Sequence, residues 1–103
     1  KELIKVKGFQ VAPAEVEAEL LAHPDVADAA VIGVADDEAG EVPVAFVVPA
    51  PGVVFDTAAV QAHLRGRLAS YKVPRVMHVV DAVPKSASGK ILRRVLRDRL
   101  AAQ

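Results

Sequence analysis

The sequence contains no cysteine and no tryptophan, and only three Phe and one Tyr among its 103 residues. The absence of cysteine excludes a disulfide framework and a cysteine metal site. So few aromatic side chains leave little for stacking against bases, so we expect no nucleic acid as partner. Since no apolar run is long enough to span a membrane or arranged as a signal peptide, we predict no transmembrane segment and a soluble, cytoplasmic protein.

Basic side chains are missing from the middle of the sequence. Residues 8–64 contain ten acidic side chains and no Lys or Arg, although the whole chain has zero formal net charge. Both ends of the chain are therefore basic, and folding that brings them together creates a positive pole suited to phosphates. We interpret Glu15, Glu17 and Glu19 as a solvated face.

The length predicts one small domain with a single core and too little mass to enclose a substrate by itself. We find no repeat, no low-complexity tract and no second domain. We therefore expect this chain to supply only part of an active site.

A β-hairpin is predicted over residues 3–11, where polar and apolar side chains alternate until Gly8 interrupts them. A two-residue turn of Lys7 and Gly8, with Gly8 at positive φ, places Val6 opposite Phe9 and Lys5 opposite Gln10. Lys5 and Gln10 then share the polar face of the ribbon.

A helix is predicted to begin at Pro13, a residue that suits the first helical turn, and to end before Pro24. Glu15 lies at the positive end of the helix dipole, and Val16 and Leu20 share one face. We expect this helix to be structural.

Two strands rich in Val and Ala are predicted over residues 26–34 and 42–48, joined by a turn over residues 36–40. Pro43 indicates that its strand begins there or runs at a sheet edge. A third strand is predicted over residues 75–80.

Two further helices are expected. Asp56 or Thr57 can cap the first, which is followed by a break over residues 71–74. Its apolar stripe consists of Val60, Leu64 and Leu68. The last helix covers residues 91–100. Its predicted inward residues are Ile91, Leu92, Val95, Leu96 and Leu100. Its predicted outer or rim residues are Arg93, Arg94, Arg97 and Arg99.

Several chemistries are disfavoured by spacing. The histidines His23, His63 and His78 fall on different predicted elements, so we propose no metal ligand in this chain. No serine lies in a G-x-S-x-G frame. The Gly89-Lys90 pair is not a P-loop, since Pro84 and Ile91 stand where that motif needs Gly and Ser or Thr.

Lys90 is the candidate that remains, within the segment PKSASGKILRR of residues 84–94. Small residues precede it and can form a sharp turn that lets the lysine approach a ligand. Its ammonium is a point charge that can stabilise an anion developing in phosphoryl or acyl transfer. The alternative is a solvated loop lysine without function.

Three segments carry a family resemblance: KELIKVKGFQVAPAEVE at residues 1–17, AGEVPVAFVV at 39–48 and PKSASGKILRR at 84–94. Together they resemble the C-terminal domain of acyl- and aryl-CoA synthetases, in the adenylate-forming superfamily that includes firefly luciferase and nonribosomal peptide synthetase adenylation domains. The 4-coumarate-CoA ligases and their fatty acid relatives are the most similar group. The resemblance implies an α+β fold, with an N-terminal β-hairpin followed by a small three-stranded sheet packed with helices.

The resemblance also implies a division of labour. Residues 1–103 would be a mobile lid beginning at the hinge residue Lys1, and a large N-terminal domain outside this chain would bind ATP, Mg²⁺ and a carboxylic acid. Lys90 would serve formation of the acyl-adenylate. The hairpin with Lys5, Gly8 and Gln10 would then replace it for attack by the CoA thiol.

Further positions are candidates on the CoA side. Gly8 leaves room for the pantetheine arm, although any turn glycine fits the position. Basic side chains could contact the pantetheine arm or the CoA phosphates: Lys7, Lys72, Arg75, Arg93 and Arg94.

Three alternatives stay open at this point. A carrier protein could replace CoA as acceptor, the chain could be a free-standing module that binds phosphate or nucleic acid, or it could be a structural domain that only regulates a partner. The resemblance favours the CoA ligase, in which this domain alone is expected to be inactive.

Overall fold

The long strand β4 (Gly40–Pro49) is the centre of the fold in the computed structural model, which describes residues 2–102. It pairs antiparallel with β3 (Val26–Asp36) and with β1 (Ile4–Val6), and parallel with β5 (Val76–Val79). β2 (Phe9–Val11) continues the sheet beyond β1. The described residues thus form a five-stranded sheet with the path β2-β1-β4-β3, and β5 also on β4.

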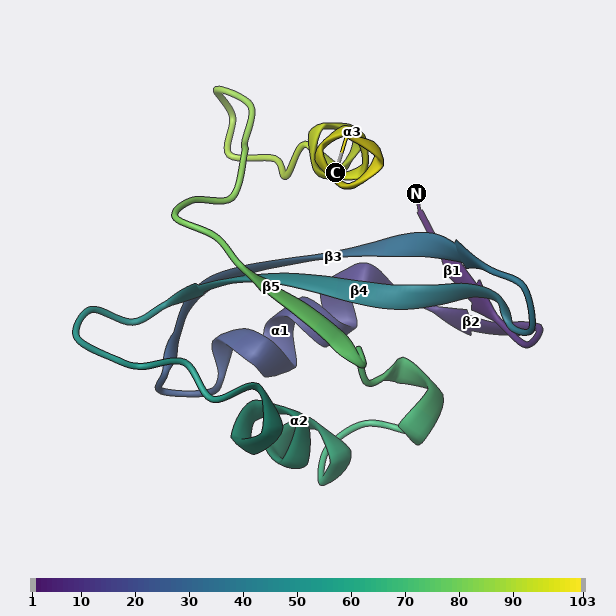
Figure 1. Ribbon diagram of the computed structural model, residues 1–103, viewed down its shortest axis with the longest axis horizontal. Coiled ribbons are helices and arrows are strands. Elements are labelled where there is room, and N and C mark those ends of the chain that lie inside the picture. Colours follow the sequence, from purple (N-terminus) through teal and green to yellow (C-terminus); the bar gives the residue numbers. More distant parts are fainter. Residues whose placement is uncertain (1, 103) are drawn as a thin grey trace.

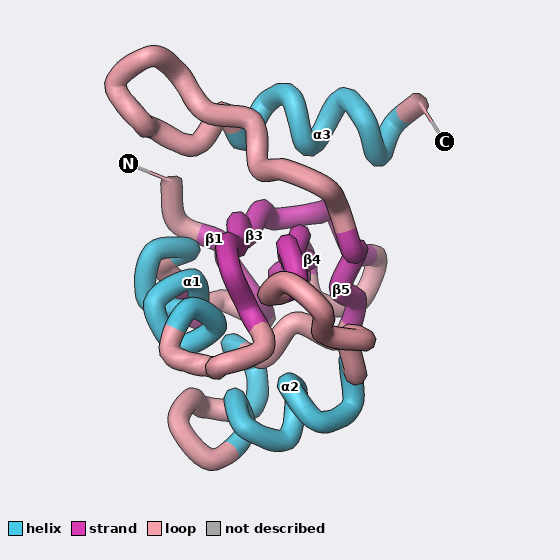
Figure 2. The backbone as a smooth tube through the Cα atoms, turned by 90° about the vertical axis from the view of Figure 1, so that its left-hand side faces the viewer, coloured by secondary structure: helices cyan, strands magenta, loops and turns pink. Residues whose placement is uncertain are grey.

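Helices cover both faces of this sheet (Figures 1 and 2). α1 (Pro13–Leu21) and α2 (Thr57–Arg65) lie on one face, and α3 (Arg93–Ala101) lies on the other. A short 3-10 turn (Ser70–Lys72) leads from α2 into β5. The predicted α+β class is confirmed.

The hairpin register is also confirmed. Val6 pairs with Phe9 and Lys5 with Gln10. Lys7 has φ 51° and Gly8 has φ 84°, so both central turn residues have the positive φ that a type I′ turn requires. The Lys7 amide donates to the carbonyl of Ala39 over 2.7 Å, which fixes this turn against the turn between β3 and β4.

The hairpin belongs to the main sheet instead of preceding a separate three-stranded one, because Val6 pairs with Gly40. β5 pairs with the same edge of β4 as β1, but its pairing begins only at Val44. Pro43 lies in the interval between the two pairings, where a residue without an N–H is tolerated. The strand therefore begins at Gly40 and not at Pro43, but Pro43 does lie at a local edge.

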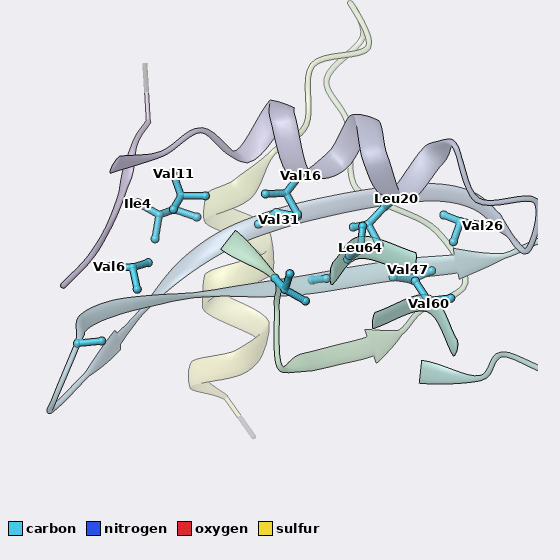
Figure 3. Close-up of a cluster of buried hydrophobic side chains, with 14 residues drawn as sticks. Ile4, Val6, Val11, Val16, Leu20, Val26, Val31, Val47, Val60 and Leu64 are labelled. Carbon is cyan, nitrogen blue, oxygen red and sulfur yellow. The ribbon is translucent and has the colours of Figure 1, made fainter. Parts of the chain in front are cut away.

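Both sheet faces are buried, which explains why β3 and β4 are almost continuously apolar. Val31 and Val47 belong to the core under α1 and α2, whereas Ile32 and Phe46 belong to the core under α3. The helix residues predicted to face inward are confirmed on the first of these faces (Figure 3): Val16, Leu20, Val60 and Leu64. Asp56 is the cap of α2, with its Oδ1 accepting from the Ala59 amide at 3.2 Å.

We expect Leu20→Ala to lower the free energy of unfolding by about 3 kcal/mol, because it leaves a cavity in a fully buried position. Leu21→Ala is the matched control, since Leu21 is the next residue of α1 and is 47% exposed. Urea unfolding followed by circular dichroism measures both. Equal losses in the two variants would show that Leu20 is not a core residue.

The last helix differs from its prediction. It begins at Arg93 instead of Ile91, because the Leu92 amide is bonded to the carbonyl of Pro84. Leu96 is buried, but Leu92 and Val95 are exposed, so their predicted inward orientation is wrong. Arg93 points toward the sheet and is not an outer residue of this helix.

Candidate functional site

The loop that carries Lys90 is closed by its own hydrogen bonds. The Ser86 amide donates to the Lys90 carbonyl over 2.8 Å, and the Gly89 amide donates to the Ser86 carbonyl over 2.9 Å. The Lys90 amide donates to the Ser86 hydroxyl over 3.2 Å, and Gly89 has φ 86°. The small residues noted in the sequence therefore build a preformed loop, which holds the backbone of Lys90 in place.

The two limbs of this loop are joined at its base. Lys85 forms an isolated antiparallel bridge with Ile91, and the Leu92 amide donates to the Pro84 carbonyl over 2.9 Å. Lys85 Nζ also lies 2.6 Å from Asp28 Oδ2 on β3. Within residues 2–102, the ammonium of Lys90 has no hydrogen-bond or ion-pair partner. Its charge is thus available to a ligand.

Lys90 lies beside the N-terminal segment of the described chain. It lines a shallow groove together with Leu3, Pro13 and Arg94. Arg97 NH2 lies 2.6 Å from Glu2 Oε1, and this hydrogen bond lowers the pKa of Glu2. The basic C-terminal helix therefore does meet the N-terminal segment. The hinge candidate Lys1 lies outside the described residues.

The hairpin presents a second set of candidates. Lys5 and Gln10 are paired residues on the same exposed face, and the Lys5 amide donates to Glu41 Oε1 over 2.9 Å. A Cβ on Gly8 would meet nothing within 4 Å. Within the described chain, the positive φ of Gly8 is therefore the reason for a glycine at this position. A narrow passage for the pantetheine arm would need a second wall from another domain.

Lys7 and Arg75 line a pocket of about 300 Å³ at the interval between β1 and β5 where Pro43 lies. Tyr71 also lines it, and the ring of Tyr71 stacks on Phe9 with centroids 4.7 Å apart. This stack connects the hairpin to the segment before β5. Two cationic side chains, Lys7 and Arg75, and two acidic ones, Asp36 and Glu38, thus border one small pocket.

Lys72 lies next to that pocket but is engaged. Its Nζ is 2.9 Å from Glu15 Oε1, and this hydrogen bond raises the pKa of Lys72. Arg94, in contrast, lines the groove beside Lys90. The structure therefore separates the candidates for CoA contact into one group near the hairpin turn and another at the start of α3.

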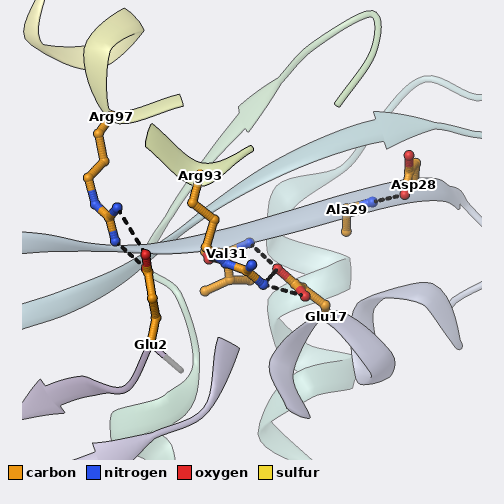
Figure 4. A network of polar contacts seen from close by, with 7 residues as sticks. All are labelled: Glu2, Glu17, Asp28, Ala29, Val31, Arg93 and Arg97. Atoms are coloured by element: carbon orange, nitrogen blue, oxygen red, sulfur yellow. Dashed lines mark hydrogen bonds and ion pairs between the residues drawn. The ribbon is translucent and has the colours of Figure 1, made fainter. Parts of the chain in front are cut away.

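The sequence interpretation missed an ion pair between the buried Glu17 and the partly buried Arg93 (Figure 4). Glu17 is 7% exposed, so its assignment to a solvated face is wrong. Glu17 Oε2 accepts from the Val31 amide at 2.8 Å and from Arg93 NH2 at 2.8 Å, and Arg93 Nε donates to the Val31 carbonyl over 3.1 Å. Because these bonds use Nε and NH2 of Arg93, a contact with a CoA phosphate that leaves them intact could use only NH1.

Burial raises the pKa of Glu17, opposed by the bonds from Val31 and Arg93. A signal for the inward position was present in the sequence. The buried residues of α1 are Pro13, Val16, Glu17 and Leu20, which is the spacing of a helix's inner stripe. Glu17 therefore stands at a core position.

The histidines do not assemble a metal site in the described chain. His23 and His63 meet edge to face with centroids 5.0 Å apart, but no group of three His, Asp or Glu side chains within residues 2–102 could hold a metal ion. Residues 2–102 also include no helix that is long and apolar enough to cross a membrane.

The chain belongs to the family described as the AMP-binding enzyme C-terminal domain, which it matches over residues 15–90. Membership of the adenylate-forming superfamily, which the sequence resemblance indicated, is thereby confirmed. The match ends at Lys90, the lysine of the closed loop.

Individual relatives are consistent with this assignment. The chain is 65% identical over 98 residues to 4-coumarate--CoA ligase-like 9 of Oryza sativa subsp. japonica, covering 95% of this chain and 18% of the relative. An acyl-CoA synthetase of Brucella canis superposes with a TM-score of 0.92 at 35% identity, over 99% of this chain and 19% of that one. The o-succinylbenzoate CoA synthetase of Bacillus subtilis, solved with an acyl-adenylate intermediate, superposes with a TM-score of 0.88 at 41% identity. The match covers 93% of this chain and 19% of that one. The chain thus spans about a fifth of each relative's length.

Proposed function

We propose that this chain is the mobile C-terminal domain of an ATP-dependent acyl- or aryl-CoA ligase, whose hinge lies at Lys1. The observation that carries the proposal is the preformed loop that presents the unpaired ammonium of Lys90. The three internal hydrogen bonds hold the backbone of Lys90 in one conformation, which suits a residue that must place a charge on a ligand. The family match and the exposed pair of Lys5 and Gln10 support the same assignment.

In the first half-reaction, a carboxylate oxygen of the acid attacks the α-phosphorus of ATP, and pyrophosphate leaves. Lys90 contacts the carboxylate and the α-phosphate and stabilises the negative charge that develops between them. We assign Mg²⁺ and most of the ATP contacts to the N-terminal domain, as the family resemblance implies. The unpaired ammonium of Lys90, on the limb that follows the turn at residues 87–89, fits the remaining contact to phosphate.

In the second half-reaction, the sulfur of CoA attacks the acyl carbonyl, the thioester bond forms and AMP leaves. Lys5 and Gln10 face the adenylate from one side of the hairpin, and Gly8 lets the pantetheine arm pass the turn. Lys7 and Arg75 border the pocket beside this turn together with Asp36 and Glu38, and we assign contact with the CoA phosphates to these two cations. Lys72 lies nearby, but its ammonium is paired with Glu15. Arg94 lies with Lys90 and contacts CoA only if the molecule reaches α3.

The two sets of residues lie on different parts of the domain. Figure 1 shows the Lys90 loop beside α3 above the sheet, whereas the turn between β1 and β2 lies at the right-hand end of the sheet. A single docked orientation therefore does not bring both to one reaction centre. The domain serves the two half-reactions in turn by rotating against its partner domain.

The function is tested on the full-length protein by separating the half-reactions. We expect ATP–pyrophosphate exchange that depends on a carboxylic acid, followed by thioester formation when free CoA is added. The residues 1–103 alone are expected to catalyse neither step, because the nucleotide-binding domain is missing. Transfer to a carrier phosphopantetheine but not to CoA would identify a carrier-loading enzyme, and exchange by the isolated chain would contradict the proposed domain division.

A further inference from the structure

The exposed edge of β3 is closed by side chains instead of by a strand. β3 is the last strand on its side of the sheet formed by residues 2–102. The outward amide and carbonyl of Val31 are bonded to Glu17 and Arg93, which are themselves bonded to each other. The carboxylate and the guanidinium therefore take the acceptor and donor places of a neighbouring strand.

The same contact anchors the Lys90 loop. Arg93 is the first residue of α3 and follows Lys90 after only Ile91 and Leu92. On the other limb, Lys85 is bonded to Asp28, which also lies on β3. The loop is thus tied to one strand on each side of Lys90, and the bond between Leu92 and Pro84 closes its base.

The two contacts that tie the loop to β3, one through Arg93 and one through Lys85, differ in burial. The side chains of Arg93 and Glu17 are 18% and 9% exposed, whereas those of Lys85 and Asp28 are 38% and 29% exposed. A buried charge-assisted pair with directed donors holds its geometry better than an exposed pair, which competes with water. The tie through Arg93 is therefore the stronger of the two.

We propose that Arg93, held by Glu17 and Val31, is a positioning residue that sets where the Lys90 loop stands relative to the sheet. The inference rests on the proposed role of Lys90 in adenylation. Charge stabilisation depends on placement, and a displacement of about 1 Å can cost roughly 10²-fold in rate. Loss of the tie displaces the loop without removing its lysine.

The test compares Arg93→Gln with Arg99→Gln in the full-length protein. Arg99 is an exposed residue of the same helix and lies outside the site. We expect Arg93→Gln to lower kcat for pyrophosphate exchange about tenfold or more, with KM for ATP little changed. Conversion of supplied acyl-adenylate with CoA stays near wild type, and Arg99→Gln changes neither step.

Arg93→Lys and Lys85→Gln extend the series. A lysine keeps the charge but loses the planar fork that serves Glu17 and Val31 together, so it rescues adenylation only in part. Lys85→Gln removes the exposed tie and has a smaller effect. It also provides the test if Arg93→Gln does not fold.

Amide exchange read by mass spectrometry separates this inference from the proposed function. Faster exchange confined to residues 84–92 in Arg93→Gln supports the tie even if the wild-type protein forms no adenylate, an outcome that would refute the proposed function alone. Equal losses in both half-reactions, or unchanged exchange and unchanged adenylation, would overturn the positioning role.

Discussion

Replacing Lys90 with alanine is expected to lower acyl-adenylate formation by roughly 10²- to 10³-fold, the cost of removing one preorganised charge from a transition state. The substitution removes only the charge and leaves the surrounding structure intact. Alanine keeps the loop, whose closing bonds use the Ser86 side chain and the backbone, and deletes only the ammonium. Acid-dependent pyrophosphate exchange by the full-length protein measures the loss.

The second half-reaction is the internal control for this variant. Lys90→Ala should convert supplied acyl-adenylate and CoA to thioester at close to the wild-type rate, since Lys90 has then left the reaction centre. Lys90→Arg keeps the positive charge on a longer, planar group and should retain an intermediate rate of adenylation. Wild-type adenylation by Lys90→Ala would remove the lysine from the mechanism.

Replacing Lys5 with alanine is expected to have the opposite profile. Thioester formation from supplied acyl-adenylate should fall by roughly 10²-fold, because the hairpin loses the charge that faces the leaving AMP. Pyrophosphate exchange should persist. The fold tolerates the change, since the contact of residue 5 with Glu41 uses its backbone amide and the pairing with Gln10 is also a backbone feature.

Lys7→Ala is the matched comparison for Lys5→Ala on the same hairpin. Lys7 borders the pocket next to Arg75, so its loss should raise KM for CoA and change kcat much less. The division of labour is contradicted if Lys90→Ala and Lys5→Ala each reduce both half-reactions to the same extent.

Much of the fold was predictable because it depends on neighbouring residues. The Lys7-Gly8 turn and the alternation on either side of it determine the hairpin register without reference to the rest of the chain. The cap at Asp56 and the stripe of Val60 and Leu64 are local in the same sense. The joining of the hairpin to β4 depends on a distant pairing, and its prediction needs the tertiary fold.

Within the candidate site, only the residues that lie in sequence motifs could be predicted. Lys5, Gln10 and Lys90 were identified from segments of sequence, and the closed loop around Lys90 agrees with the small residues before it. The orientation of Arg93 could not be read from a run of arginines. Its partner Glu17 lies far away in the sequence, and both meet at a backbone position of β3.

The pair of Glu17 and Arg93 has a consequence for self-association. An open strand edge offers its amides and carbonyls to the edge strand of another molecule, which is a common start of aggregation. At Val31 both backbone groups are already bonded to a carboxylate and a guanidinium. A second molecule therefore finds no free backbone pair at Val31, and it would have to displace a buried carboxylate and a partly buried guanidinium to add a strand there.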